Sequence, residues 1–541
     1  MKSPDKVSCE LRKIEKEIDN CYKSNPLLKL PFATAAWSLL AFGEEDILKK
    51  AHSSRRGTQY YAIVANDFIN ELKDPMYWLY RTCEPEGQVP FAYNAEIYKA
   101  SWDLFKLGQE YRWFVFVYTG ATNGWIELEL QGKTIQPKED FFRGIEYEAY
   151  DRLMKPYKSQ EALSSVNFDD FPTDAIEHSL RIEGNRFRYK LKPRIVADTI
   201  TCLKPLFNRM FLLPNEWQFS RYSLGDFRRV FEAISSMAYI RDLAKTIAMS
   251  QGCLNMGYAD SIYVPSCCEL QARVARYSGI SAAKVLSVFD DLTYGNRDVK
   301  YPDPALQPLI KLNSTCYAIM PHLWLFSAAE RNLTVLLNRI PFEKDIYAKL
   351  VDEKEDLMRE RFTTDLCRSD FRFVCGNITN LPDVDLAIVQ DSEKACLLLE
   401  LKWFIDPAEI REIMEKSEEI KKGVSQVIKL KQAFTENHAP LLAKLNVDSS
   451  YKLEGAVVSE NWIGYADVQS PKVPVIRVDH LIAKLKTTRS LQSTMEWLTD
   501  RKYLPKEGTH FKFIRPTYTI GKWNLKWYGI KPLIKDAFFP L

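Results

Sequence analysis

The sequence predicts a mainly α-helical N-terminal region followed by an α/β C-terminal domain. Three stretches with helical spacing of apolar residues fall within the first 110 positions, over 38–50, 60–72 and 95–108. In the C-terminal third, two apolar runs of strand length, 384–389 and 395–402, flank a polar turn. At 541 residues, 46% of them hydrophobic, the chain is long enough for roughly two to four domains with sizeable cores.

Residues 1–230 are expected to form a helical sensing or assembly region that contains one β-hairpin. The segment 112–130 has two β-rich runs around Asn123-Gly124, a dipeptide typical of tight hairpin turns. Helical spacing returns over 141–154, 193–203 and 227–249. No motif in this region indicates a particular chemistry.

Residues 231–335 are predicted to form a winged-helix-like module. A tight turn around Gly279 separates helices expected over 269–277 and 281–292, with Ser281 as the N-cap, and segment 308–320 is the expected wing. The second helix carries two aspartates and only one basic residue, Lys284, which suits an anionic groove poorly. We therefore favour a structural module, with sequence reading as the alternative.

Charged residues stand at the ends of the two C-terminal strands that are predicted to face each other. Strand side chains alternate, so Glu400 and Lys402 share a face. If the two runs pair as a hairpin, Asp385 lies beside them. Two carboxylates and an ammonium at a buried sheet end are costly to desolvate. A divalent cation such as Mg²⁺, which takes carboxylate ligands, would compensate that cost.

An aspartate followed on the next strand by Glu-x-Lys resembles the PD-(D/E)xK nuclease superfamily. The resemblance covers the C-terminal third only and implies a restriction-endonuclease-like α/β core within 336–541 that cuts phosphodiesters with Mg²⁺ or Mn²⁺. It implies that Asp385 and Glu400 bind the metal and that Lys402 positions or deprotonates the attacking water. Asp383 shares the strand face of Asp385 and is the alternative acid.

The flanking segments add two candidate residues that the resemblance implies. Upstream, 344–362 has helical spacing and carries Glu355 and Glu353, either of which is similar to the acid that the family supplies from its first core helix. Glu355 fits better, because apolar residues follow it three and seven positions on. Downstream, the helix expected over 409–434 carries Gln426, similar to a glutamine that orients the family's site. A solvated helix face is the alternative for both.

Strands expected over 453–458 and 473–478 complete the order of helix, strand, strand, helix, strand, strand. With a net charge of only +3, contacts with DNA must come from local patches. The tail from residue 481 contains twelve Lys and Arg against four acids, with Trp523, Trp527 and Tyr528 among them. This mixture can hold a backbone and stack on bases, and a solvated surface around buried aromatics is the alternative.

Other features narrow the class of protein. The eleven cysteines form no CxxC pair, the N-terminal segment is charged, and no apolar run approaches the ~20 residues of a membrane span. We therefore expect a cytoplasmic protein without a signal peptide or membrane partner. Phosphate-loop, dinucleotide, serine-elbow and HExxH motifs are absent, and the six histidines are scattered.

These observations predict a metal-dependent endonuclease that hydrolyses DNA and, as the family implies, leaves 5′-phosphate ends. A large sensing region fused to such a domain is typical of bacterial anti-phage defence or restriction effectors, which is an analogy of architecture. A homo-oligomer is expected because cutting two strands generally needs two sites, and a partner protein that gates activity would be compatible. The alternatives are a nucleic-acid-binding or assembly protein with a vestigial core, and a nuclease that cleaves RNA.

Overall fold

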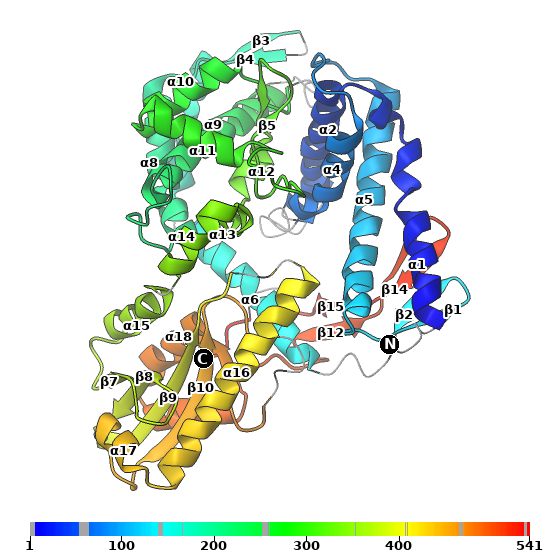
Figure 1. Ribbon diagram of the computed structural model, residues 1–541. Coiled ribbons are helices and arrows are strands. Elements are labelled where there is room, and N and C mark those ends of the chain that lie inside the picture. Colours follow the sequence, from blue (N-terminus) through cyan, green and yellow to red (C-terminus); the bar gives the residue numbers. More distant parts are fainter. Residues whose placement is uncertain are drawn as a thin grey trace. The chain divides into compact units, whose positions relative to one another are not determined.

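The computed structural model describes residues 6–541 except 54–63, 66, 139–143, 165, 185, 252–257, 259, 352, 406, 408, 465–467, 469 and 535–537. The chain folds as two compact units (Figure 1). The helical unit comprises Met1–Phe114 and Ser159–Lys349, and the sheet unit comprises Val115–Lys158 and Leu350–Leu541. As predicted, the protein is mixed α/β, with N-terminal helices and a C-terminal sheet region. Residues 115–158, assigned from sequence to the N-terminal region, belong to the sheet unit.

The helical unit is built largely from helices, whose buried apolar residues form separate core clusters. Helix α9 (Leu224–Ser250) begins where the Ser223 hydroxyl and the Asp226 carboxylate cap each other's backbone N–H groups. The helices are α1 (Lys6–Ile18), α2 (Phe32–Ser53), α4 (Lys73–Thr82), α5 (Ala95–Thr122, as far as Phe114), α7 (Thr173–Ser179), α8 (Pro193–Met210), α9 (Leu224–Ser250), α10 (Cys267–Ser278), α11 (Ala282–Leu292), α12 (Pro321–Leu325), α13 (Ala329–Arg339) and α14 (Pro341–Leu350). The helices predicted over 38–50, 193–203 and 227–249 are confirmed within α2, α8 and α9. Part of the stretch 60–72 lies outside the described residues.

The hairpin predicted over 112–130 is wrong, because the chain continues as helix α5 (Ala95–Thr122). Phe114 and Val117 are buried three positions apart, on one face of that helix. Packing of this face overrides the strand propensity of the local sequence. Gly124, at φ +73°, follows the helix end. A hairpin does form immediately afterwards, from β1 (Leu128–Gln131) and β2 (Thr134–Pro137).

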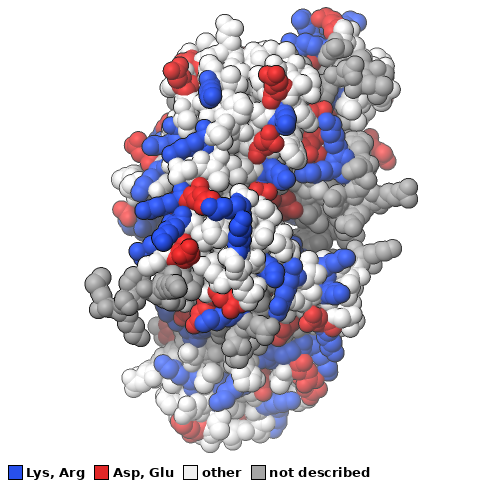
Figure 2. Space-filling view, turned by 90° about the vertical axis from the view of Figure 1, so that its right-hand side faces the viewer, with Lys and Arg blue, Asp and Glu red and all other residues white. Residues whose placement is uncertain are grey.

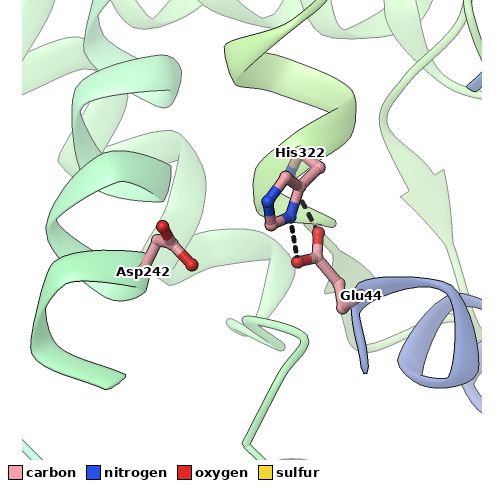
Figure 3. A group of neighbouring side chains, drawn as sticks. All are labelled: Glu44, Asp242 and His322. Carbon is pink, nitrogen blue, oxygen red and sulfur yellow. Dashed lines mark hydrogen bonds and ion pairs between the residues drawn. The ribbon is translucent and has the colours of Figure 1, made fainter. Parts of the chain in front are cut away.

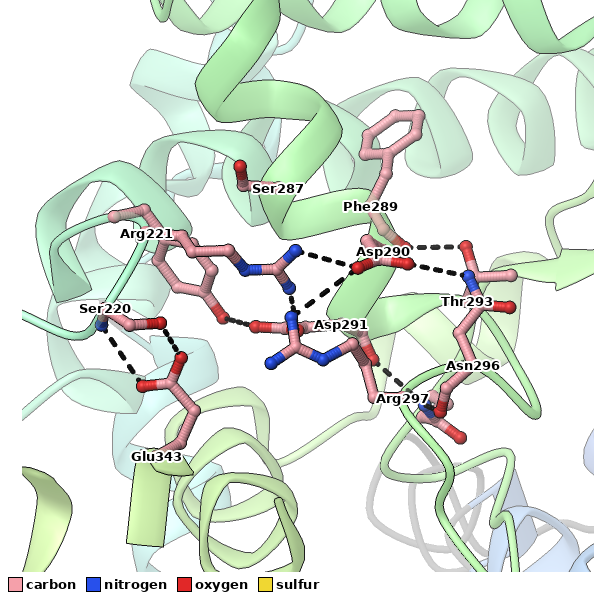
Figure 4. Close-up of polar contacts among 12 residues, drawn as sticks. Ser220, Arg221, Ser287, Phe289, Asp290, Asp291, Thr293, Asn296, Arg297 and Glu343 are labelled. Carbon is pink, nitrogen blue, oxygen red and sulfur yellow. Dashed lines mark hydrogen bonds and ion pairs between the residues drawn. The ribbon is translucent and has the colours of Figure 1, made fainter. Parts of the chain in front are cut away.

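The predicted helix-turn-helix is present as α10 and α11, and a short hairpin of β5 (Ile310–Lys311) and β6 (Tyr317–Ala318) follows it. Gly279 adopts φ +68° at the turn. Asp290 accepts a hydrogen bond of 2.7 Å from Arg221, and Asp291 accepts one of 2.6 Å from the Tyr222 hydroxyl (Figure 4). Lys284 donates to Asp226 at 2.6 Å. The charged groups of α11 are therefore used internally, which supports the structural interpretation of this module.

A five-stranded mixed sheet forms the centre of the sheet unit, in the order β11-β10-β9-β8-β7. Strand β8 runs antiparallel to its neighbours β7 and β9, whereas β10 runs parallel to both β9 and β11. These strands are β7 (Arg372–Gly376), β8 (Val384–Gln390), β9 (Ala395–Lys402), β10 (Lys452–Ser459) and β11 (Val475–Arg477). Four of them were predicted, and β7 was not.

Helices cover both faces of this sheet, because alternate residues of its central strands are apolar in both directions. Leu397 and Leu399 pack in the cluster that includes Met358, whereas Cys396 and Leu398 pack in the cluster that includes Leu430. The helices are α6 (Ile145–Ser164), α15 (Glu353–Asp365), α16 (Ile410–Thr435), α17 (Ala439–Leu445), α18 (Val478–Thr488) and α19 (Leu491–Thr499). The helix expected over 344–362 is in fact two, α14, which ends at Leu350, and α15, which begins at Glu353, close to the boundary between the two units.

The C-terminal segment folds into β12 (Phe511–Ile514), β13 (Thr517–Ile520), β14 (Trp523–Lys526) and β15 (Gly529–Pro532). β14 pairs in parallel with β2. This pairing unites strands from both segments of the sheet unit in one four-stranded sheet, in the order β1-β2-β14-β13. Across the described residues, no helix is both long enough and apolar enough to cross a membrane.

Candidate active site

The antiparallel pairing of β8 with β9 brings Asp385 to the charged end of β9. Leu386 pairs with Leu399, so the preceding residue of β8 faces the following residue of β9. An Asp385 carboxylate oxygen accepts a hydrogen bond of 2.9 Å from the Leu401 backbone N–H. The predicted juxtaposition of Asp385 and Glu400 is therefore present.

Glu400 and Lys402 form an ion pair at this end of the sheet. The Lys402 Nζ donates to Glu400 Oε1 at 2.7 Å. The Glu400 side chain is 2% exposed and the Lys402 side chain 19%. A charge-assisted hydrogen bond in such a buried, low-dielectric environment is stronger than the same bond in water. The lysine thus has one firm partner and retains N–H donors that can serve another group.

Burial dominates the electrostatics of the site. It raises the pKa of Glu400 to about 7, and the nearby Asp385 carboxylate adds to the shift. Burial also raises the pKa of Asp385. For Lys402, burial acts to lower the pKa, but the neighbouring carboxylates, Glu400 above all, outweigh it and the net pKa is raised. One ammonium therefore does not fully compensate the carboxylates, and the site favours a further cation.

Glu355, from α15, belongs to the same electrostatic group. Its pKa is raised chiefly by burial, and the charge of the Asp385 carboxylate raises it further. Its charge in turn acts on Glu400 and Lys402. Glu353 is exposed. Of the two helix acids left open by the sequence, the structure therefore brings Glu355 to the site. Asp383 is likewise exposed, whereas Asp385 is half-buried.

Gln426 is half-buried on α16, and its side chain makes no hydrogen bond within the described part of the chain. The α16 residue that does reach the site is Gly423. A Cβ atom at this position would lie 2.9 Å from Glu400 Cγ and 3.5 Å from Lys402 Cε. Sequence reasoning missed this glycine, although a glycine inside a long helix usually has a packing reason.

Arg359 is a second residue that sequence reasoning missed. Its guanidinium lies 3.5 Å from the backbone carbonyl oxygen of Asp385 and bonds to Asp356. The side chain is 28% exposed, so it reaches the solvent beside the acids. It follows Glu355 by four positions, a spacing that places two side chains on one helix face and could have identified it.

The aromatic residues of the C-terminal tail are mostly occupied within the fold. Trp527 is 3% exposed and packs edge-to-face with Phe116. The Tyr528 hydroxyl donates to Glu148 at 2.7 Å. Trp523 is half-buried. These contacts favour the solvated surface around buried aromatics over a base-stacking tail.

A second group of possible metal ligands lies in the helical unit (Figure 3). One ligand atom each from Glu44, Asp242 and His322 lies within 4.8 Å of the others. The His322 backbone N–H donates to Glu44 at 2.8 Å, and its ring contacts the same carboxylate. The buried Lys245 ammonium adds a positive charge next to both acids. These donors could hold a metal ion, but they can also balance one another's charge as a structural cluster.

Among the described residues, only the Glu44 group brings three such ligand atoms within 4.8 Å. The ligand atoms of Asp385, Glu400 and Glu355 do not lie within that distance of one another. Their chemistry nevertheless fits a hard cation, because carboxylate oxygens suit Mg²⁺ and Mn²⁺. Comparisons with family models, curated proteins and solved structures found no match for the chain.

Proposed function

We propose that the sheet unit is a metal-dependent endonuclease that hydrolyses DNA phosphodiester bonds. The observation that carries the proposal is the convergence of Asp385, Glu400 and Lys402 at one strand end, with Glu355 beside them. A mixed sheet flanked by helices, in which this strand pair is central, is compatible with a restriction-endonuclease-like core. The order α15, three strands, α16, α17 and two strands departs from the expected order by the additional strand β7 and the additional short helix α17.

Each residue of the site has a role that follows from its position. Asp385 and Glu400 would hold Mg²⁺ or Mn²⁺, with Glu355 as a third carboxylate. When bound, such an ion neutralises charge on the phosphate and makes water more acidic. Lys402, protonated at neutral pH by its raised pKa, can orient a water molecule or stabilise phosphate charge. Arg359 adds a partly exposed cation that can bind an adjacent phosphate.

Two alternatives remain distinct from this proposal. A vestigial core, serving only in binding or assembly, is disfavoured because Asp385, Glu400 and Lys402 are all present and assembled. Cleavage of RNA uses the same residues, so only a comparison of substrates separates it from cleavage of DNA. We place the protein among anti-phage defence or restriction effectors by analogy of architecture alone.

The proposal is tested by incubating the full chain with Mg²⁺ or Mn²⁺ and four substrates side by side: supercoiled plasmid, linear duplex, single-stranded DNA and RNA. Wild type is compared with Asp385→Asn and with the matched control Asp383→Asn, an exposed aspartate two positions earlier. We expect wild type and the control to cut DNA, and Asp385→Asn to be inactive. Equal cutting by Asp385→Asn would disprove the assignment, and cutting of RNA alone would favour the second alternative.

A further inference from the structure

The densest run of basic residues in the helical unit spans positions 181–194, RIEGNRFRYKLKPR. It contains six basic residues and a single acid, Glu183. On the face of the molecule shown in Figure 2, Lys and Arg lie among Asp and Glu. The basic residues of this run are all exposed, and they are Arg181, Arg186, Arg188, Lys190, Lys192 and Arg194.

The first part of the run is a hairpin of β3 (Arg181–Glu183) and β4 (Arg186–Arg188), at the top of the molecule in Figure 1. It is anchored by Phe187, which is 2% exposed and lies under the Arg241 guanidinium at 4.2 Å from the ring centre. The Phe187 backbone N–H also donates to Asp260 at 3.2 Å. Because strand side chains alternate, this anchoring directs Arg186 and Arg188 to the opposite side. The hairpin therefore presents its cations from a fixed support.

Arg186 and Arg194 have carboxylate partners, Asp260 and Asp198 respectively, whereas the other cations of the run are poorly neutralised. Arg181 and Arg188 are direct cross-strand partners. Like charges directly opposite each other destabilise an antiparallel pair. Glu183 lies 3.4 Å from Arg188, but both side chains are more than half exposed, so this ion pair contributes little. Arg181, Lys190 and Lys192 have no ion pair within the described part of the chain. A polyanion would relieve this repulsion.

An exposed aromatic ring adjoins the hairpin, and a second follows that ring closely in sequence. The Arg186 guanidinium lies 5.2 Å from the Phe91 ring centre. Phe91 is 36% exposed, and Tyr93, two residues on, is 60% exposed. Aromatic faces beside a basic surface suit the stacking of unpaired bases, and arginine forks suit phosphate oxygens. Together these features favour a nucleic acid over an acidic protein or a lipid surface.

We infer that the 181–194 hairpin segment is a nucleic-acid-binding surface that holds the phosphate backbone independently of sequence. It extends the proposed function by giving the helical unit a role in substrate capture, but it does not depend on cleavage. Binding of this kind weakens with salt because each neutralised phosphate releases counter-ions.

The test is anisotropy of a labelled 30-nucleotide single strand and a labelled 30-base-pair duplex, titrated with the full chain in EDTA so that cleavage cannot contribute. The variant Arg181→Gln/Arg188→Gln/Lys190→Gln avoids Arg186, whose contact with Asp260 supports the hairpin. The control, Arg12→Gln/Lys13→Gln/Lys16→Gln, removes the same charge from exposed positions of α1. We expect at least a tenfold loss of affinity for one or both probes in the hairpin variant only.

The slope of log affinity against log salt should also fall, by up to about 2.7 for the duplex and about 2.1 for the single strand if all three side chains meet phosphates. No binding by wild type, or equal losses in the two variants, would overturn the inference. Vesicles rich in phosphatidylserine serve as a second probe. Binding to vesicles but not to either nucleic acid, lost in the hairpin variant, would also overturn it, in favour of a membrane surface. A failure of nuclease activity would leave these binding results unaffected.

Discussion

Gly423→Ala is the substitution that most sharply tests whether the position of Glu400 matters. The added methyl would lie 2.9 Å from Glu400 Cγ, 3.4 Å from Val457 Cγ2 and 3.5 Å from Lys402 Cε. A contact below 3 Å forces one partner to move, and Glu400 has little space because its side chain is 2% exposed. We therefore expect the carboxylate to shift by roughly half an ångström, since a normal carbon–carbon contact is about 3.5–4.0 Å.

The effect on stability should be small because two terms oppose each other. Overpacking of a dense core costs about 1–3 kcal/mol, whereas replacing a helix-interior glycine with alanine contributes about 1 kcal/mol in favour of the fold. The net loss is then at most about 2 kcal/mol. Catalysis is more sensitive, because a displacement of about 1 Å can lower a rate by about 100-fold. We expect at least a tenfold loss of activity.

The assay is the initial rate of plasmid cleavage in Mg²⁺, with urea denaturation run on the same samples. Ser425→Ala, on an exposed position of the same helix, is the control for the change in helix propensity. Wild-type activity in Gly423→Ala would refute the reasoning, as would a loss of activity matched by global unfolding.

Three further predictions concern the acids. Glu355→Gln should lower the rate of metal-dependent cleavage at least tenfold, whereas Glu353→Gln should not. Equal initial rates for the two variants would exclude Glu355 from the site. Mn²⁺ should raise the Tm of wild type more at pH 8 than at pH 6, because Glu400, with a pKa of about 7, must lose its proton before it can bind the ion. An equally large Mn²⁺-dependent increase in Tm for Asp385→Asn would contradict this prediction. Because the pKa of Glu400 is raised in the folded state, wild-type stability should fall as pH rises from about 4.5 to about 7, by on the order of 3 kcal/mol. The free energy of unfolding of Glu400→Gln, measured by denaturation, should not show that fall. Parallel profiles of stability against pH for wild type and Glu400→Gln would refute the prediction.

The strand pair and its charges were predictable because the signals are local. Each run is apolar to its end, the turn between them is short, and the period of two fixes which charges share a face. The position of Asp385 beside Glu400 follows from antiparallel pairing alone. The choice of Glu355 over Glu353 was only indicated, since it depends on the angle at which α15 meets the sheet.

Features that depend on packing between distant segments were beyond the sequence patterns. Gly423 meets Glu400 only because α16 approaches β9 closely. The pairing of Thr134 with Asn524 joins segments far apart in sequence, so the sheet that contains β2 and β14 left no local signal. The false hairpin at 112–130 arose from strand-prone residues that the fold uses as a helix face. Strong local propensity gives way to tertiary packing there.

The measurement that tests the central claim most directly is plasmid cleavage by Lys402→Ala compared with Lys431→Ala. Both lysines pair with a glutamate, Glu400 and Glu454 respectively, but only the first pair lies at the proposed site. Wild type and Lys431→Ala should convert supercoiled plasmid to nicked or linear forms in Mg²⁺, and Lys402→Ala should not. Undiminished cutting by Lys402→Ala would contradict the assignment of this site as the nuclease centre.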